Sequence, residues 1–214
     1  MKSPVIVLGA GGHAKVLIDT LLLGSAELVG VTDSNPRKLK DNVLGIPVLG
    51  TDEVVLEYSA DKILLVNGLG TTSTMENRKN LFDVFKNRGY TFATVIHPSA
   101  VISDHAQIRE GAQIMAGAIV QVGCSIGANT IVNTKVSIDH DCNIGANVHL
   151  APGVTLSGGV HVAEGVHIGT GATVIQGVTI GKNALIGAGT LVLKDIAEGT
   201  TVVGVPARVI HARY

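Results

Sequence analysis

The sequence predicts an amino-terminal α/β domain followed by a parallel β-helix. Up to about Thr94 the segments alternate between strand-like and helix-like patterns, whereas from Ile102 onward an aliphatic residue recurs at every sixth position. Aromatic residues make up only 3% of the 214 residues, while glycine occurs 27 times. Such a chain builds its core from thin layers of small aliphatic side chains, as stacked short repeats do. We expect domains at residues 1–95 and 96–214.

The amino-terminal part contains alternating strands and helices. An apolar run, a glycine turn and an amphipathic segment make up PVIVLGAGGHAKVLIDTLL, and ELVGVTD is a second strand. A polar connection with a hairpin-like piece follows in NPRKLKDNVLGIPVLG. KILLVNG then predicts a buried strand, TMENRKNLFDVFKNRG a helix and TFATVI one further strand. Alternating strands and helices indicate a Rossmann-like parallel sheet covered by helices.

The second part follows a six-residue period without a slip. From Ile102 to Val192, sixteen consecutive hexads begin with an aliphatic residue, and the fifth position is always small, β-branched or cysteine. Three hexads predict one triangular coil of eighteen residues, with the first position filling the interior and the fifth beside it. Cys124 and Cys142 are eighteen residues apart, so we expect them to stack as buried side chains in adjacent coils.

Charge and hydropathy exclude several classes of function. Sixteen basic and seventeen acidic side chains nearly balance, which argues against a dedicated nucleic-acid binder or a polybasic membrane anchor. No apolar run is long enough to span a bilayer, and residues 1–10 lack the features of a signal peptide. Two cysteines give no disulfide framework. We therefore expect a cytoplasmic protein without nucleic-acid or membrane partners.

The segment GAGGHA, from Gly9 to Ala14, fits G-x-G-x-x-A between a strand and a helix, and Asp33 ends the next strand. Taken alone, this pattern predicts NAD(P) binding. Against it, only one short βαβ-type half precedes the β-helix, and no other segment offers a hydride-transfer site. Amides at the helix amino terminus can instead hold the diphosphate of a single nucleotide, with Asp33 on its base or ribose. A merely tight strand–helix turn is the alternative.

Polar residues elsewhere leave alternatives open. Arg78 either neutralises a phosphate or is an ordinary solvated helix residue. In VSIDHDCNIGANVHLAPG, His140 and His149 occupy no interior position, so both should point outward or lie at a corner. A solvated outward histidine is also the ordinary interpretation of His161 and His167. A histidine beside a carboxylate suits proton transfer near neutral pH, and the tripeptide DHD offers an aspartate on each side of His140.

The segments VLGAGGHAKVLID, IVNTKVSIDHDCNIG and HLAPGVTLSGGV, with the hexad repeat and the tail VVGVPARVI, together resemble the nucleotide-sugar acetyltransferases. These include bacillosamine and perosamine N-acetyltransferases and related sialic acid O-acetyltransferases. The resemblance covers essentially the whole chain. It implies a left-handed β-helix, acetyl-CoA as co-substrate, and a homotrimer with CoA in the groove between neighbouring prisms. Spacing alone gives no handedness.

The resemblance also implies roles for individual residues. His140 is the general base, and Asp141 raises its basicity, with Asp139 as a spare. Gly158 lies one coil beyond His140, so its amide is beside the same site and can stabilise an oxyanion. The implied substrate contacts are Gly12, His13, Ala14, Asp33, Gly68, Gly70 and Asn133. The implied acetyl-CoA contacts are His149, Gly158, Thr170 and Ala188.

The predicted function is acetyl-CoA-dependent N-acetylation of a nucleotide-linked amino sugar in glycan biosynthesis. The leading substrate is a UDP-4-amino-4,6-dideoxy sugar such as the bacillosamine precursor. Alternatives are N-acetylation of GDP-perosamine, O-acetylation of sialic acid, and a nucleotide sensor whose β-helix is only a trimerisation stalk. A stalk needs neither DHD nor a second histidine. Some hexapeptide-repeat proteins are carbonic anhydrases with three-histidine zinc sites, but a nucleotide-type domain does not accompany that resemblance, so we expect no metal.

Overall fold

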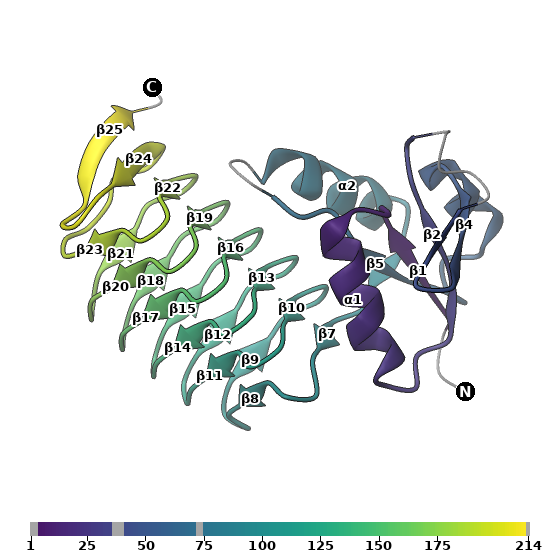
Figure 1. Cartoon of the computed structure of the whole chain (residues 1–214), viewed down its shortest axis with the longest axis horizontal. Coiled ribbons are helices and arrows are strands. Elements are labelled where there is room, and N and C mark those ends of the chain that lie inside the picture. Colours follow the sequence, from purple (N-terminus) through teal and green to yellow (C-terminus); the bar gives the residue numbers. More distant parts are fainter. Residues whose placement is uncertain (1–3, 36–40, 72–74, 213–214) are drawn as a thin grey trace.

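The computed structural model describes residues 4–35, 41–71 and 75–212. Figure 1 shows an α/β domain, coloured purple to blue, at one end of a long β-helix that extends away from it toward the carboxyl terminus. Residues 36–40, near the start of the expected polar connection, lie outside the described residues. None of the helices in the described ranges combines the length and the apolar character that a membrane span requires.

A six-stranded sheet with the order β3-β4-β2-β1-β5-β6 forms the amino-terminal domain. All neighbours pair in parallel except β3 and β4, which confirms the predicted α/β sheet. The connections contain α1 (Gly12–Leu22), α2 (Glu76–Asn87) and a 3-10 helix, η2 (Asp52–Glu57), which the sequence pattern did not predict. The strands are β1 (Val5–Leu8), β2 (Leu28–Thr32), β3 (Asn42–Val43), β4 (Ile46–Gly50), β5 (Leu64–Asn67) and β6 (Thr91–Phe92).

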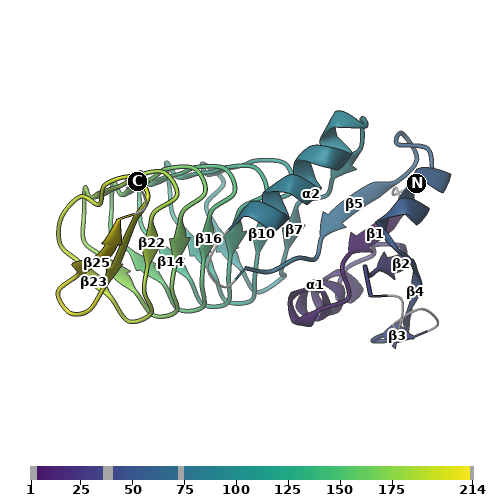
Figure 2. The same ribbon diagram turned by 90° about the horizontal axis from the view of Figure 1, so that it is seen from above.

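Alternation along β1 buries both faces of the sheet. Val5 and Val7 pack in a cluster with the apolar side of α1, whereas Ile6 and Leu8 pack in a second cluster with Phe85 of α2. Figure 2 shows the two helices on opposite sides of the β1–β5 pair. A parallel strand buried on both faces has a continuous apolar sequence, which is why VIVL contains no polar residue.

Two short segments depend on local backbone geometry. The predicted hairpin is confirmed: β3 and β4 are joined by Leu44 and Gly45, both with positive φ, as a two-residue hairpin turn requires. The single strand predicted for TFATVI is wrong, because the segment forms two strands in different sheets. β6 pairs with β5, and β7 (Val95–Ile96) pairs with β10 of the β-helix. The predicted division at 95 and 96 would cut β7, so we propose that the domains divide at residues 93–94.

Sixteen two-residue strands, one for each predicted hexad, build the β-helix, and each ends on the predicted aliphatic residue. Each pairs in parallel with the strand one coil away. They are β8 (Val101–Ile102), β9 (Gln107–Ile108), β10 (Gln113–Ile114), β11 (Ile119–Val120), β12 (Ser125–Ile126), β13 (Ile131–Val132), β14 (Ser137–Ile138), β15 (Asn143–Ile144), β16 (His149–Leu150), β17 (Thr155–Leu156), β18 (His161–Val162), β19 (His167–Ile168), β20 (Thr173–Val174), β21 (Thr179–Ile180), β22 (Leu185–Ile186) and β23 (Leu191–Val192).

These strands form three faces of a prism. The first face contains β7, β10, β13, β16, β19 and β22, the second runs from β8 to β23, and the third from β9 to β21. One continuous core of first-position and fifth-position side chains fills the interior, as predicted. Cys124 and Cys142 are buried in it with free thiols, which donate to the carbonyls of Asp139 and Ser157 at 3.0 and 3.2 Å.

The tail continues the first face. β24 (Thr200–Val203) adds in parallel to β22, and β25 (Arg208–Ala212) then returns antiparallel to β24. This hairpin contains the segment VVGVPARVI that follows the last predicted hexad. It covers the last coil at the end opposite the amino-terminal domain (Figure 1).

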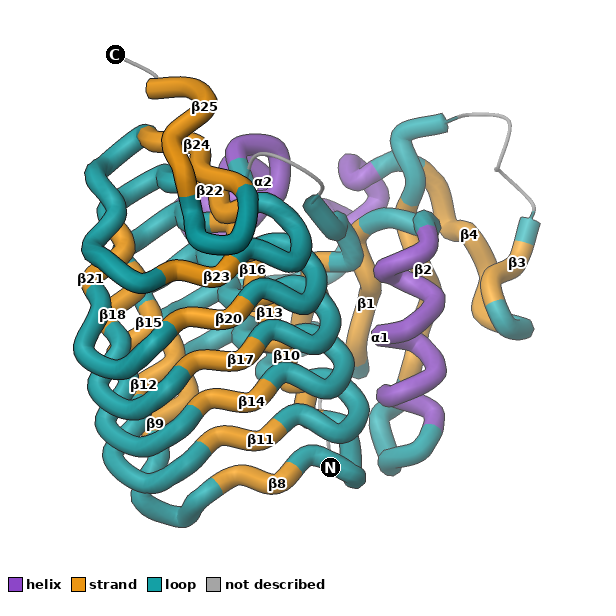
Figure 3. Tube along the Cα trace, turned by 60° about the vertical axis from the view of Figure 1, so that its left-hand side comes forward, coloured by secondary structure: helices purple, strands orange, loops and turns teal. Residues whose placement is uncertain are grey.

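The amino-terminal domain covers the outside of the first face. In Figure 3, α1 stands beside this face. Met115 and Val95 of the β-helix belong to the same apolar cluster as α1. On β10, β13, β16 and β19, the residue before each interior aliphatic points outward, yet all four are buried: Gln113, Ile131, His149 and His167. The two domains therefore share a buried boundary, and the polar residues of the candidate site lie along it.

Candidate active site

The first part of the site is the glycine loop between β1 and α1. Gly9 has a φ of 99°, and Gly11 precedes the helix without any side-chain cap. Thr32 and Asp33, at the end of β2, hold the loop by accepting hydrogen bonds from the amides of Gly9 and Ala10 at 3.3 and 3.2 Å. An uncapped helix amino terminus presents backbone N–H groups and a partial positive charge, which suits an anionic ligand.

Gly68 brings the neighbouring loop against this turn. A Cβ added there would lie 2.7 Å from the carbonyl oxygen of Leu8 and 2.9 Å from the Cβ of Ala14, so only glycine fits without movement. Its amide donates to the Leu8 carbonyl at 2.8 Å. A Cβ on Gly70 would lie 3.1 Å from the Cβ of His13. The two glycines let the loop after β5 lie close to the start of α1.

A cavity of about 610 Å³ opens between these loops and the first face of the β-helix. Six of the seven predicted substrate contacts line it. Ala14 does not, because it is fully buried beneath Gly68. The full lining is Gly9, Ala10, Gly11, Gly12, His13, Val16, Asp33, Ser34, Asp52, Gly68, Leu69, Gly70, Thr71, Leu81, Asn133 and His149. We call this the nucleotide cavity.

The His13 ring is neutral in this cavity and donates its single proton to Gln113. Its Nε2 lies 2.7 Å from Oε1 of Gln113, whose Nε2 donates to the carbonyl of Asn67 at 2.8 Å. Since that bond fixes the Gln113 amide, the ring nitrogen must carry the proton and donate. Burial, and to a smaller extent the charge of Arg78, lowers the pKa of His13 to about 4. His13 thus carries no positive charge, and its single ring proton is taken by Gln113.

Arg78 is neither a phosphate-binding residue nor a solvated helix residue, the two roles expected from the sequence. Its side chain is fully buried in the domain boundary, so it does not reach a phosphate and is not solvated. Nη1 donates to the carbonyls of Asn67 and Leu69 at 2.8 and 2.7 Å, and Nε donates to the carbonyl of Asn129 at 3.2 Å. Burial lowers its pKa to about 9. The helical position of Arg78 in the sequence gave no sign that this face would be covered.

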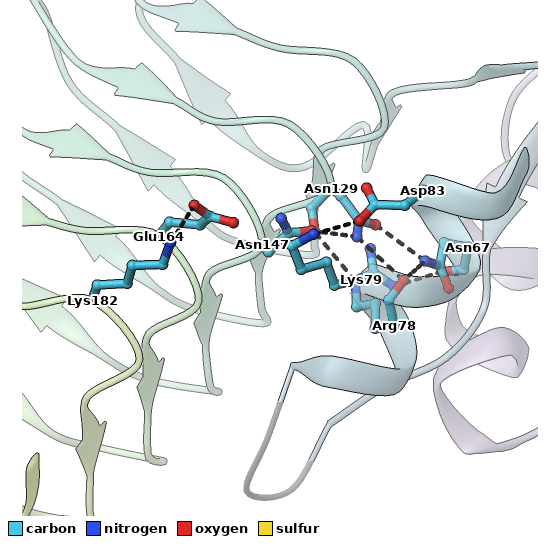
Figure 4. Close-up of polar contacts among 8 residues, drawn as sticks. All are labelled: Asn67, Arg78, Lys79, Asp83, Asn129, Asn147, Glu164 and Lys182. Carbon is cyan, nitrogen blue, oxygen red and sulfur yellow. Dashed lines mark hydrogen bonds and ion pairs between the residues drawn. The ribbon is translucent and has the colours of Figure 1, made fainter. Parts of the chain in front are cut away.

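Amides complete the cluster around Arg78, as Figure 4 shows. Asn67 Nδ2 donates to the carbonyl of Arg78 at 2.9 Å and to Oδ1 of Asn129 at 3.2 Å. Asn129 in turn donates to Oδ1 of Asn147, in the next coil, at 2.8 Å. Solvated ion pairs of Lys79 with Asp83 and of Lys182 with Glu164 lie outside this buried group. The cluster joins β5, α2 and two β-helix coils, so it fixes the loop after β5 relative to the prism.

His149, on the first face, points outward as predicted but is buried by the covering domain. Its Nδ1 lies 2.6 Å from the hydroxyl of Thr71, and its Nε2 lies 3.1 Å from the amide nitrogen of Asn133. His167 is one coil further, with ring centroids 5.0 Å apart at 89°. The expectation of a solvated His167 is wrong, whereas His161 on the third face is exposed. Burial lowers the pKa of His167. Burial, with smaller effects of neighbouring charges, lowers the pKa of His149 to about 3.

A second cavity, of about 340 Å³, continues from His149 toward the carboxyl-terminal coils. It brings together three of the predicted acetyl-CoA contacts, His149, Thr170 and Ala188. Thr71 and His149 line both cavities, so the two are contiguous. The lining of this cofactor cavity is Thr71, His149, Ala151, Pro152, His167, Gly169, Thr170, Leu185, Ile186, Gly187 and Ala188.

His140 lies in the turn between β14 and β15, at the corner of the second and third faces. Asp141 has a φ of 60°, which turns the backbone so that its Oδ2 lies 2.9 Å from Nδ1 of His140. Asp139 accepts from the His140 amide at 2.8 Å. The hydrogen bond to Asp141, then the charge of Asp139, raises the pKa of His140, whose side chain is 57% exposed. A Cβ added at Gly158 would lie 2.5 Å from Cε1 and Nε2 of the ring, which confirms that Gly158 adjoins His140.

The predicted residues therefore form two groups within one chain. Asn133, Thr170 and Ala188 follow strands of the first face and lie at the corner between the first and second faces. His140 and Gly158 lie at the next corner of the prism. Sequence reasoning missed Thr71, Gln113 and the burial of His167. One signal was available: Gln113, His149 and His167 occupy the same outward position at multiples of eighteen residues.

No three His, Cys, Asp or Glu side chains within the described ranges are grouped so that they could hold a metal ion.

Comparison with known proteins gives matches to both parts. The family model of the PglD N-terminal domain matches residues 4–85, and that of the bacterial transferase hexapeptide (six repeats) matches residues 159–194. A search of curated protein sequences gives no match.

Solved structures match over almost the whole chain. A histidine-to-asparagine mutant of perosamine N-acetyltransferase from Caulobacter crescentus, in complex with CoA and GDP-perosamine, is 34% identical with a TM-score of 0.91, covering 99% of this chain and 98% of that one. The acetyltransferase domain of PglB from Neisseria gonorrhoeae, with acetyl coenzyme A, is 33% identical with a TM-score of 0.91, covering 98% and 100%. WeeI from Acinetobacter baumannii is 28% identical with a TM-score of 0.86, covering 98% and 100%.

These matches confirm the expected fold class, a Rossmann-like domain followed by a left-handed β-helix of hexapeptide repeats. They also exclude the alternative of a sensor with a mere stalk, since the matching domains are acetyltransferases. The chain is an acyltransferase and belongs to the family of left-handed β-helix sugar N-acetyltransferases that carry a PglD-type amino-terminal domain.

Proposed function

We propose that the protein transfers the acetyl group of acetyl-CoA to the amino group of a nucleotide-linked amino sugar. The observation that carries this proposal is the pair of contiguous cavities that meet at His149 and Thr71. One begins at an uncapped helix amino terminus and the other follows the outer surface of a hexapeptide β-helix. Two large substrates can therefore bind with their reacting ends together, and such proximity lowers the barrier to acyl transfer.

The nucleotide cavity has the donors and acceptors that a nucleotide diphosphate sugar needs. The backbone amides of Gly12 and His13 at the start of α1 face the diphosphate, and the neutral His13 ring adds no charge there. Asp33 accepts from the base or the ribose. Gly68 and Gly70 let the loop after β5 lie against β1 and α1, and this loop forms one wall of the cavity. The sugar then extends toward Asn133, where the cofactor cavity begins.

His140 is the proposed general base. Its Nε2 takes the ammonium-derived proton as the amine attacks the thioester carbonyl, while Asp141 accepts from Nδ1 and stabilises the imidazolium. The tetrahedral oxyanion accepts a hydrogen bond from the Gly158 amide. The intermediate then collapses with cleavage of the C–S bond, and the CoA thiolate leaves and is protonated. Replacement of one histidine in the relative captured with both ligands supports such a role for a histidine.

A complete site requires a second chain. His140 and Gly158 lie at one corner of the prism, and both cavities adjoin another corner. Three prisms around a three-fold axis place the His140 corner of one chain against the cavities of its neighbour, through one heterologous interface repeated three times. His149, Thr170 and Ala188 then contact the CoA that lies in the groove between the two prisms. We therefore propose a homotrimer.

The proposed substrate is a 4-amino-4,6-dideoxy sugar linked to UDP or GDP. Binding of GDP-perosamine by a relative of 34% identity favours the GDP-linked sugar as the second candidate beside the UDP-linked bacillosamine precursor. O-Acetylation of sialic acid has less support, because the matching enzyme acts on an amine. We propose that the protein acts in the cytoplasm.

The decisive experiment is an acetyl-CoA consumption assay with the purified protein. It compares UDP-linked and GDP-linked 4-amino sugars with the corresponding 4-hydroxy sugars and with a CMP-linked sialic acid. We expect turnover with an amino sugar and an N-acetylated product by mass spectrometry. Turnover with the sialic acid alone, or thioester hydrolysis that no amino sugar accelerates, would contradict the proposal.

A further inference from the structure

Thr71 lies at the junction of the two cavities. It belongs neither to the GAGGHA segment nor to the DHD tripeptide. It lies in the loop after β5. Its hydroxyl oxygen is 2.6 Å from Nδ1 of His149 and 3.5 Å from Nδ1 of His167. It lines the nucleotide cavity and the cofactor cavity, as His149 does. A polar group at this position touches the place where the two substrates must meet.

The surrounding hydrogen bonds determine which atom donates to which. Oδ1 of Asn133 accepts from the amide of Thr134 at 2.8 Å, so its Nδ2 faces Nε2 of His149 at 3.1 Å. A donor facing Nε2 requires an unprotonated Nε2, so the network assigns the proton of the neutral ring to Nδ1. His149 therefore donates from Nδ1 to the oxygen of Thr71.

The imidazole remains neutral, so this assignment holds at physiological pH. Burial, the neighbouring His167 and His13 rings and the charge of Arg78 all lower the pKa of His149, to about 3. Because Thr71 already accepts from His149, its own hydroxyl proton is directed elsewhere. Among residues 4–35, 41–71 and 75–212, the acceptor left for it is Nδ1 of His167 at 3.5 Å, which is too distant for a strong hydrogen bond. The hydroxyl is thus an oriented donor with capacity for a ligand.

Buried contacts hold the residues that lead up to Thr71. Arg78 donates to the carbonyls of Asn67 and Leu69 from a fully buried position, and the Leu69 amide donates to Oδ1 of Asn67 at 3.2 Å. Gly70 lies against His13. A donor placed by so many buried contacts loses little conformational freedom when it binds a ligand.

We propose that the Thr71 hydroxyl is a sugar-binding group, which donates to an oxygen of the amino sugar and so orients the sugar for acyl transfer. The inference rests on the proposed function. With the diphosphate at the start of α1, the sugar reaches Gly70, Thr71, Asn133 and His149. No Lys or Arg of the described chain lines either cavity, and a neutral donor suits a hydroxyl or ring oxygen of a sugar.

The test uses Thr71→Val, which keeps the shape and removes the hydroxyl, and Thr71→Ser, which keeps the hydroxyl. Thr91→Val, on an exposed position of the edge strand β6, is the matched control. Calorimetry measures the affinity for GDP-perosamine and for the UDP-linked 4-amino sugar, and for free GDP and UDP. We expect Thr71→Val to weaken binding of the amino sugar nucleotide about tenfold, as loss of one oriented hydrogen bond does, and to leave the free nucleotide unchanged. Thr71→Ser should restore most of the affinity.

A second readout does not depend on the substrate. In ¹⁵N-histidine NMR spectra of the whole protein, His149 should have a protonated Nδ1 and a bare Nε2 and should not titrate between about pH 5 and 8. Equal weakening for the amino sugar nucleotide and the free nucleotide, unchanged affinity in Thr71→Val, or an Nε2–H tautomer would each overturn the inference. If the wild type acetylates no amino sugar nucleotide, the proposed function fails first, whereas wild-type turnover with an unaffected Thr71→Val refutes Thr71 alone.

Discussion

At the scale of single residues, the His140 imidazole combines a carboxylate partner with access to solvent. It lies in an exposed turn, and Gly158 leaves space beside Nε2. We expect His140→Ala to lower kcat about 10²–10⁴-fold, the usual loss for a general base, without a change in folding. Steady-state kinetics at saturating amino sugar, with circular dichroism as the folding control, measure both. Wild-type turnover in the variant would show that another group takes the proton.

The charges beside His140 predict a pH dependence. The base must be neutral to accept a proton, so kcat/KM should rise with pH through the pKa of His140. Asp141, and less so Asp139, raise that pKa, which places the rise at higher pH than for an ordinary histidine. Asp141→Asn should therefore move the rise to lower pH and also lower the plateau, because the base is weaker. Asp139→Asn should move it in the same direction by less. A rise that stays in place in Asp141→Asn would contradict the assignment.

At the scale of elements, the close contact of the loop after β5 with β1 and α1 depends on Gly68. A side chain there meets the Leu8 carbonyl and the Ala14 methyl, and neither is the end of a flexible chain. We expect Gly68→Ala to destabilise the fold by about 1–3 kcal/mol, as overpacking usually does, and to raise KM for the nucleotide sugar. Thermal unfolding measures the first effect.

Gly12→Ala is the matched control for stability. A Cβ added at Gly12 finds no heavy atom within 4 Å, and alanine is a better helix former than glycine. Its melting temperature should equal or exceed that of the wild type. If both variants melt at the wild-type temperature, the loop after β5 is free to move and the proposed close contact is wrong.

At the scale of the whole molecule, His140 and the two cavities of one chain lie at different corners of the prism. Mixing His140→Ala chains with Ala188→Trp chains, in which the exposed corner of the cofactor cavity is blocked, should therefore restore activity. Random trimers formed from equal amounts contain about a quarter of their sites with both corners intact, because each site takes one corner from each of two neighbours. Each variant alone should be nearly inactive.

Sedimentation of the same samples gives the control. The mixtures must be unfolded and refolded together, or co-expressed, so that chains exchange. Activity that does not exceed that of the separate variants, in samples that sediment as mixed trimers, would contradict a shared site. A fully active monomer at the assay concentration would exclude the trimer itself.

Much of the fold could be predicted because its repeats are local. Every coil presents the same neighbours to the next, so an aliphatic residue at each sixth position determines which side chains fill the interior, and the eighteen-residue interval determines that Cys124 stacks near Cys142. The glycine turn between β1 and α1 could be predicted for the same reason, because it too depends on residues close together in the sequence. The eighteen-residue interval also places Gly158 beside His140, because the two residues lie at the same corner of the prism in adjacent coils. These features depend on contacts within about one repeat.

Only the tertiary structure decided what the amino-terminal domain covers. It buries one outward face of a prism whose three faces have the same pattern, and this turns His149 and His167 from surface residues into neutral, buried ones. It also encloses Arg78 and creates the two cavities that meet at Thr71. No local period distinguishes a covered face from a solvated one, because burial there arises from docking between residues far apart in the chain. For the same reason the sequence did not show that β6 and β7 belong to different sheets.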